Sequence, residues 1–569
     1  MGDGDIIYII YSKCGGEIRI QMSELDKNTF TRGEFSRSTS AFSVTNNGDG
    51  VWRAAPMGVS SRPELKVEPK KEEPKEEPEF RERPRRHHEP RRWPILGLIL
   101  VAVQIITSVL LMISLITMNI ISGRWIALVG GILTILAILS AIKLLFHKNA
   151  SNASKVACGT VSVIAIVLSI FALRYTDAFN GFLNKVTERK PETKQYSVVV
   201  MDQSEIKELP ELSKKNVGFL KNDEKAGNAE NYLLEKVQFT ANFYDDADTL
   251  AKVLNTNIVD AIVLETDRME ILKEEAEDTI KNTRVIYTFE IEIAAENAEI
   301  SEKKVTKDPF VLYISGSDSR NGLQARTRSD VNILAVVNPA KGKILLVSIP
   351  RDTYVQLHNT TGIKDKLTHA GVYGINMSRD TIEDFLGVNI DYTVKVSFDT
   401  VVKVVDQLNG IEINSDQAMT LKETELYNRV CEYTVGKQWV DGECALRFAR
   451  ERKSYEKGDR HRGENQMQVI TAIVSKLSES KDYILRLPEI LNIAADSFET
   501  SLTRDDISSF IRMQLNNGTN WQVESISVDG AGSMQGTYSM GANRPLYVMI
   551  PNQESVNNAA SKIREYLSV

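Results

Sequence analysis

The stretch FVLYISGSDSRNGLQARTRSDVNILAVVNPAKGKILLVSIPRD, residues 310–352, decides the fold of the second half of this 569-residue chain. It contains three largely apolar, β-prone runs, PFVLYISGSD from residue 309, VNILAVVN from residue 331 and KILLVSIPRD from residue 343, each of which ends in polar sequence. Runs this apolar are typical of strands buried on both faces of a sheet. We therefore predict an α/β fold in which helices flank a central sheet.

Charged residues stand where these runs end. Asp318, Arg320, Arg351 and Asp352 lie at predicted strand ends, where the ligands of α/β folds gather. Arginine pairs with phosphate oxygens through parallel hydrogen bonds, whereas a hard divalent cation takes carboxylate oxygens. The pattern predicts a site for a phosphate-bearing polyanion together with a divalent cation.

A second arginine cluster, FARERKSYEKGDRHRGENQ, follows about a hundred residues later. One predicted helix ends with Arg450 and Arg452, and the next begins near residue 463 with Arg462 and Gln466 around its first turns, where free amide groups favour an anion. Taken singly, each arginine fits a solvated face with ion pairs to nearby glutamates, namely Glu451, Glu456 and Glu464. Combined with the strand-end aspartates, the two clusters favour a shared site.

Composition excludes two other classes of site. The net charge of −7 and the absence of a compact basic domain or a helix-turn-helix pattern argue against nucleic-acid binding. No cysteine or histidine pair has zinc-ligand spacing. Cys14 and Cys158 stand alone, while Cys431 and Cys444 are close enough in sequence either to form a disulfide or to serve as two small apolar fillers beside a turn.

Three apolar stretches, residues 94–118, 125–146 and 156–173, are long enough to span a lipid bilayer as helices. Arginines crowd residues 81–92, and basic residues fill the loop at 147–155, whereas the first loop offers only Arg124. Because loops rich in Lys and Arg stay on the cytoplasmic side of a membrane, we predict that the amino terminus is cytoplasmic. Everything after residue 175 is then predicted to be extracellular.

We predict four regions along the chain. Residues 1–93 form a disordered cytoplasmic arm rich in Pro, Glu and Lys, with a basic segment beside the membrane. Residues 94–175 form three transmembrane helices. Residues 190–300 alternate β-like and amphipathic runs and form an extracellular accessory α/β domain without obvious catalytic groups. Residues 308–569 form a second α/β domain, which carries the arginine clusters.

From Pro309 onward the chain resembles the LytR–CpsA–Psr (LCP) family of Gram-positive cell-envelope phosphotransferases. The resemblance rests on an ordered set of motifs: GSDSR, RSD, SIPRD, KLTHAGVYG, ALRFARER and GDRHRGENQ. Three spans and an accessory domain before the catalytic domain are similar to the capsule-type subgroup. The resemblance implies transfer of a glycopolymer (capsular polysaccharide, teichoic acid or another secondary wall glycan) from a polyprenyl pyrophosphate carrier to peptidoglycan.

The resemblance also implies roles for individual residues. Asp318 and Asp330 match the carboxylates that hold Mg²⁺, for which Mn²⁺ could substitute. Asp459 matches an aspartate near the head group, either as a base or as an orienter of Arg462. The residues that match the pyrophosphate site are Arg328, Arg351, Lys366 (in a helix), Arg450, Arg452, Arg462 and Gln466. Arg351, Arg450 and Arg452, with Asp459, are the expected catalytic groups.

Three remaining arginines, Arg320, Arg326 and Arg460, are expected to be solvated neighbours of this site. Asn465 stands where many relatives carry another arginine, which lowers the expected charge of the pocket. Two alternative functions stay open: a non-catalytic polyprenyl-phosphate-binding protein that attenuates envelope gene expression, and a polyprenyl pyrophosphatase that uses water as the acceptor.

Overall fold

The computed structural model describes most of the chain from residue 93 onward. The described residues are 12–14, 17–19, 42–46, 52–56, 93–147, 151–188, 192–221, 223–293, 301–317, 326–424, 427, 429–479, 482–483, 495 and 498–568. Contacts divide the chain into two units, Met1–His88 and Glu89–Val569. In the first unit β1 (Ser12–Cys14) pairs with β2 (Glu17–Arg19), and β3 (Phe42–Asn46) pairs with β4 (Trp52–Pro56), all antiparallel. The rest of the predicted disordered arm lies outside the described residues.

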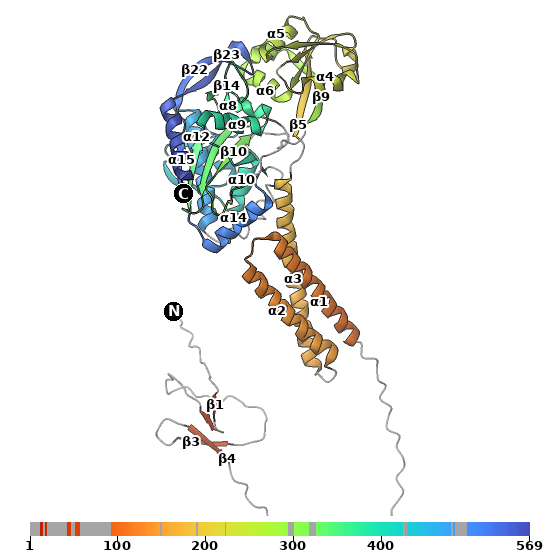
Figure 1. Cartoon of the computed structure of the whole chain (residues 1–569), viewed down its shortest axis with the longest axis vertical. Coiled ribbons are helices and arrows are strands. Elements are labelled where there is room, and N and C mark those ends of the chain that lie inside the picture. The colour runs from red at the N-terminus through yellow and green to blue at the C-terminus, as the bar shows by residue number, and fades with distance from the viewer. Residues whose placement is uncertain are drawn as a thin grey trace, which may run out of the picture. The chain divides into compact units, whose positions relative to one another are not determined.

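Three long apolar helices open the second unit (Figure 1). They are α1 (Trp93–Met118), α2 (Gly123–Ala141), which continues as the π-helix η1 (Ile142–Phe146), and α3 (Asn152–Thr187). All three are long and apolar enough to cross a membrane, and much of their apolar surface is exposed. Hydroxyl pairs join them, with Ser140 to Ser162 at 2.7 Å and Ser114 to Thr176 at 2.6 Å, as is typical of helices packed in lipid.

The third helix is longer than predicted. We expected it to end near residue 173, but α3 continues to Thr187. Its last turns bury Phe179, Phe182 and Val186 in a cluster that also contains Ile511 of α14 (Arg504–Asn517). These apolar contacts explain the extension, because the helix end has a protein surface to pack against.

The region after α3 contains a five-stranded sheet of order β7-β6-β8-β5-β9. Its strands are β5 (Glu192–Met201), β6 (Asn216–Leu220), β7 (Thr240–Tyr244), β8 (Ala261–Glu265) and β9 (Thr283–Ile293). The helices are η2 (Leu209–Leu212), α4 (Ala226–Leu234), α5 (Ala247–Asn255), α6 (Thr266–Glu275) and α7 (Glu277–Ile280). Two apolar clusters, one with Leu250 and one with Leu233, bury the sheet.

The second sheet has six strands in the order β20-β15-β10-β11-β12-β21. They are β10 (Phe310–Ser317), β11 (Val331–Asn338), β12 (Lys343–Ser348), β15 (Tyr392–Ser397), β20 (Phe498–Thr500) and β21 (Gln522–Ser527). The three apolar runs of the opening stretch form the adjacent strands β10, β11 and β12, which pair antiparallel. β15 and β21 add to the two sides of this trio in parallel.

Helices cover both faces of this sheet, as predicted (Figure 1). On one face Ile382 of α9 (Ile375–Leu386) and Ile563 of α15 (Gln553–Leu567) share a core with the strands. On the other face, Met467 of α12 (Asp459–Glu479) and Phe510 of α14 share a core with the strands.

The remaining elements of this region are β13 (Tyr354–Val355), β14 (Asp365–Lys366), α8 (Leu367–Ala370), η3 (Gly371–Tyr373), α10 (Phe398–Gln407), β16 (Ile411–Ser415), β17 (Met419–Leu421), β18 (Cys431–Tyr433), β19 (Gly436–Val440), α11 (Gly442–Arg450), β22 (Gly530–Thr537) and β23 (Gly541–Pro551).

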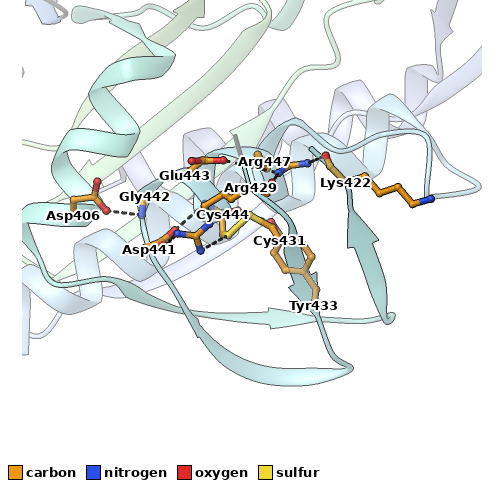
Figure 2. Close-up of a disulfide and its surroundings, with 10 residues drawn as sticks. All are labelled: Asp406, Lys422, Arg429, Cys431, Tyr433, Asp441, Gly442, Glu443, Cys444 and Arg447. Carbon is orange, nitrogen blue, oxygen red and sulfur yellow. Dashed lines mark hydrogen bonds and ion pairs between the residues drawn. A yellow bond between two sulfur atoms is a disulfide. The ribbon is translucent and has the colours of Figure 1, made fainter. Parts of the chain in front are cut away.

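A disulfide joins β18 to α11 through Cys431 and Cys444 (Figure 2). Both residues are buried in an apolar cluster with Phe448. Arg429 lies beside the bond, and its guanidinium donates to Cys444 Sγ at 3.2 Å and pairs with Asp441, the residue that caps α11. The question that the sequence left open is resolved in favour of the disulfide, which anchors the helix ending at Arg450.

Removing this disulfide should lower stability. Because the bond closes a loop with a sequence separation of 13 residues, C431S/C444S is expected to lose about 2–3 kcal/mol of stability. Thermal unfolding of the detergent-solubilised chain, followed by near-ultraviolet circular dichroism, measures the effect. The matched control is C158S, which removes a free thiol. Equal unfolding midpoints for wild type and C431S/C444S would contradict the assigned bond.

Candidate functional site

The predicted site residues gather at one edge of the six-stranded sheet. Asp330 immediately precedes β11, and Arg351 and Asp352 follow β12. Because β11 and β12 are antiparallel, the start of one strand and the end of the other meet at the same edge. The backbone N–H of Asp330 donates to the carbonyl of Gly316 at the end of β10, which fixes the aspartate there at 2.8 Å.

Arg351 is the centre of the site. It is only 7% exposed, its Nη1 donates to Asp330 Oδ1 at 2.7 Å, and its Nε lies 3.7 Å from Asp352 Oδ1. Burial would raise the pKa of Asp330, but Arg351, Arg328 and Arg462 together hold it below its usual range. The carboxylate of Asp330 is therefore charged at neutral pH.

The first turn of α12 adds a second ion pair. Arg462 Nη2 lies 2.6 Å from Asp459 Oδ1 and 3.4 Å from the carbonyl of Asp330. Burial raises the pKa of Asp459 and lowers that of Arg462. The helix begins at Asp459, earlier than the predicted start near residue 463. The helix can approach β12 closely because residue 463 is a glycine. A Cβ at this position would lie only 2.5 Å from Ser348 Oγ.

Lys366 and Arg328 complete this group. Lys366 is buried, its Nζ lies 3.6 Å from Asp352 Oδ1, and it pairs with Glu275 of α6. The prediction that Lys366 lies in a helix is wrong. Lys366 is the last residue of β14, has an extended backbone and immediately precedes α8. We call the following residues the ion-pair cluster: Arg328, Asp330, Arg351, Asp352, Lys366, Asp459 and Arg462.

Arg450 and Arg452 line a neighbouring cavity of about 460 Å³ at the end of α11. The Arg450 guanidinium donates to the Tyr427 hydroxyl at 3.1 Å and lies over the Phe398 ring. Arg452 is close enough to Arg462 to help lower its pKa, behind burial and Arg351. The cavity is also lined by basic residues and one acid, namely Lys422, Arg447, Lys453 and Glu451. We call it the basic cavity.

The remaining predictions have mixed outcomes. Gln466 is buried on α12, one turn after Arg462, whereas Asp318 and Arg320 lie outside the described residues. Arg326 is not solvated as expected: it is 6% exposed and donates to the carbonyl of Tyr373 at 2.7 Å, because the chain folds back over η3. Arg460 is partly exposed and pairs with Asp529.

Asn465 has a structural explanation. Its side-chain amide is buried and donates to the carbonyl of Phe448 at 3.1 Å and to the Tyr455 hydroxyl at 3.2 Å. It therefore ties α12 to the end of α11, the helix that carries Arg450.

The oxygen atoms at the site show whether it could hold a divalent cation. Asp330 and Asp352 face Arg351 from two strands, and Oδ1 of Asp352 is buried without a hydrogen bond. Buried carboxylate oxygens of this kind are ligands that Mg²⁺ accepts, so the chemistry fits. Within the described ranges, however, no three metal-type side chains converge, and Asp318 falls outside them.

Sequence reasoning missed two acidic residues at this site. Glu274 and Glu275 end α6, in the region of the five-stranded sheet, yet Glu274 pairs with Arg328 and Arg351, and Glu275 pairs with Lys366. Nothing marks them in the sequence except two adjacent acids at the end of an amphipathic run, since the contact crosses between the two sheets.

Comparison with known proteins gives the family. Residues 273–555 match the LytR_cpsA_psr family. The TagU of Halalkalibacterium halodurans, described as a polyisoprenyl-teichoic acid–peptidoglycan teichoic acid transferase, is 30% identical over 266 residues, 46% of this chain and 81% of the relative. The TagU proteins of Bacillus subtilis and Enterococcus faecalis, described in the same words, are 36% identical over 212 residues and 34% identical over 203 residues.

These matches differ in extent. The alignments cover 37% and 35% of this chain, and only 64% of the length of the B. subtilis and E. faecalis relatives. The crystal structure of B. subtilis TagV is 25% identical, with a TM-score of 0.39, and covers 46% of this chain and 98% of that chain. The family match and the extent of the H. halodurans alignment show that the chain belongs to the LytR–CpsA–Psr family.

Proposed function

We propose that the chain transfers a glycopolymer from a polyprenyl pyrophosphate carrier to a hydroxyl of peptidoglycan. The observation that carries this proposal is the ion-pair cluster: three cations paired with carboxylates of the cluster, with Arg328 beside them, next to the basic cavity. The descriptions of the TagU relatives as teichoic acid transferases support a teichoic acid as polymer and peptidoglycan as acceptor. Capsular polysaccharide and other secondary wall glycans fit the same chemistry.

The reaction requires negative charge to be stabilised on phosphate oxygens. The acceptor hydroxyl oxygen attacks the phosphorus that bears the glycan, the bond from that phosphorus to the bridging oxygen breaks, and polyprenyl phosphate leaves. Arg351 and Arg462, with Arg450 and Arg452 beside them, are positioned to neutralise the leaving and transferring oxygens. Water in place of the hydroxyl would give pyrophosphatase activity as a side reaction.

The proton of the acceptor hydroxyl needs a base. Asp459 is the candidate, because burial raises its pKa and so increases its proton affinity. The same carboxylate pairs with Arg462 at 2.6 Å, which makes it an orienter of that arginine as well. The two roles predict different effects of pH on turnover.

A divalent cation belongs to this proposal. Asp330, together with Asp318, would hold Mg²⁺ or Mn²⁺, and Asp352 supplies a further buried oxygen nearby. When bound, the cation would neutralise charge on the pyrophosphate oxygens. Arg351 would then have two tasks, since it contacts both carboxylates and would also pair with a phosphate oxygen.

We further propose that the site lies outside the cell and the amino terminus inside. The excess of arginine and lysine before α1 and between α2 and α3 supports this orientation. The disulfide supports it independently, because such bonds persist in oxidising surroundings. An extracellular site would meet lipid-linked pyrophosphates at the outer membrane face.

Substitution of Arg351 tests the transferase proposal. R351A is expected to reduce kcat by about 100-fold or more, since one preorganised donor to a developing oxyanion contributes on that scale. The assay measures polymer release from a polyprenyl pyrophosphate-linked glycan by the full chain in proteoliposomes. R460A, at a partly exposed arginine outside the cluster, serves as the control. Binding of the substrate by wild type without any turnover would instead support the non-catalytic binding protein.

The pH dependence of turnover distinguishes the roles of Asp459. Because burial raises the pKa of this carboxyl, a base at this position should lose activity as the pH falls through that raised pKa, above the usual aspartate range. In D459N the acidic limb of the kcat/KM profile should disappear along with most of the rate. A D459N profile that keeps the acidic limb would assign the aspartate to orienting Arg462 only.

Metal removal gives a further test. Chelation with EDTA should abolish polymer release, and Mg²⁺ or Mn²⁺ should restore it, because the carboxylate oxygens of this site suit hard cations. D330N should require a metal concentration at least about tenfold higher for half-maximal rate, since it loses a charged ligand. Full turnover in EDTA would contradict the metal assignment.

A further inference from the structure

The end of α6 reaches from the five-stranded sheet into the ion-pair cluster. Glu274 pairs with Arg328, and its Oε1 lies 3.4 Å from Arg351 Nη2. Glu275 pairs with Lys366. Three of the cations expected to bind a pyrophosphate are therefore occupied by two carboxylates from α6, in the region of the five-stranded sheet.

An apolar contact holds α6 in this position. Met269 and Leu272 of α6 are buried in the same cluster as Val372, Met540 and Leu546 of the second α/β region. This cluster spans the two regions, so the glutamates are presented by a packed helix and not by a free surface loop.

A salt-bridge pair reinforces the contact. Arg544 of β23 pairs with Asp278 of α7 and, at 3.3 Å, with Asp248 of α5. Beside this salt bridge the backbone of Gly541 lies close to Asp246. A Cβ on Gly541 would be only 2.7 Å from the Asp246 side chain. The position of Glu274 and Glu275 on the site is thus a property of the interface.

The charges of the site show what the glutamates do. The cluster has four cations, which face three carboxylates of its own and two more from α6. With the glutamates in place the carboxylates outnumber the cations, so this cluster has no net positive charge to offer a pyrophosphate diester beyond that of the basic cavity. Without them the cations are in excess.

Two of the three cations that the glutamates contact keep other partners without them, whereas the ion pair of Arg328 is with Glu274. Arg351 keeps Asp330 and Asp352 as partners, and Lys366 keeps Asp352. Burial would raise the pKa of Glu274, but Arg328 and Arg351 hold it below the usual range, so the carboxylate is charged. The Glu274 side chain is 38% exposed and can rotate into solvent without unpacking α6.

We propose that Glu274 and Glu275 are an intramolecular competitor for the anionic substrate. Their carboxylates take the places of phosphate oxygens on Arg328, Arg351 and Lys366, leave when a lipid pyrophosphate binds, and return as the lipid monophosphate departs. The accessory region thereby sets the affinity of the site and promotes product release. This inference rests on the proposed function, since it takes the lipid pyrophosphate as the ligand.

Neutralising the two glutamates tests the inference. E274Q/E275Q keeps the shape of both side chains, so the fold should be retained, which thermal unfolding checks. The dissociation constants of geranylgeranyl pyrophosphate and geranylgeranyl monophosphate are measured by calorimetry on the full chain in detergent with Mg²⁺. Loss of the competing carboxylates should tighten binding of both lipids by about tenfold or more.

The matched control is E270Q/E277Q, which removes two exposed charges from α6 and α7 that have no described ion pair. It should leave both dissociation constants within about twofold, since that difference is under 0.5 kcal/mol. Unchanged or weaker binding by E274Q/E275Q, with wild type binding normally, would overturn this inference and leave the transferase proposal standing. If wild type, E274Q/E275Q and the control all fail to bind the pyrophosphate, both proposals fall.

Discussion

The pairing of Arg351 with Asp330 at the buried edge of the six-stranded sheet is the interaction on which the site depends. It joins the start of β11 to the end of β12, and it places a guanidinium between two carboxylates where water is largely excluded. A buried cation of this kind needs partners, and the partners need it, since removing either leaves an uncompensated charge. The rest of the site is arranged around this pair: α12 brings Asp459 and Arg462, and α6 brings Glu274.

The long apolar helices and the disulfide lie away from this pair but are in contact with elements of the same α/β region. The end of α3 packs on α14, which itself covers one face of the six-stranded sheet, so the long apolar helices are in contact with the second α/β region. The bond between Cys431 and Cys444 fixes α11, the helix that delivers Arg450 to the basic cavity. The region of the five-stranded sheet contributes two carboxylates, Glu274 and Glu275, directly to the ion-pair cluster.

Local sequence patterns predicted the strands and spans because the signals are local. Uniformly apolar runs gave β10, β11 and β12, and the same reasoning found three spans, although the length of α3 depended on a tertiary contact with Ile511. The arginines and aspartates were found from their place at strand ends and from family motifs. Glu274, Glu275 and the buried state of Arg326 could not be found this way, because each depends on a contact between distant segments. Roles for the site residues, including Asp318, stay predictions.

Following the phosphorus atom through the reaction tests the proposed transfer. The full chain in proteoliposomes is given peptidoglycan and a polyprenyl pyrophosphate-linked glycan whose glycan-proximal phosphate carries a radioactive label. The label is expected to appear in peptidoglycan as a phosphodiester to the glycan, while the lipid retains the unlabelled phosphate. Label that stays on the lipid, or that is released only as a free phosphorylated glycan in the presence of peptidoglycan, would contradict the proposed transfer.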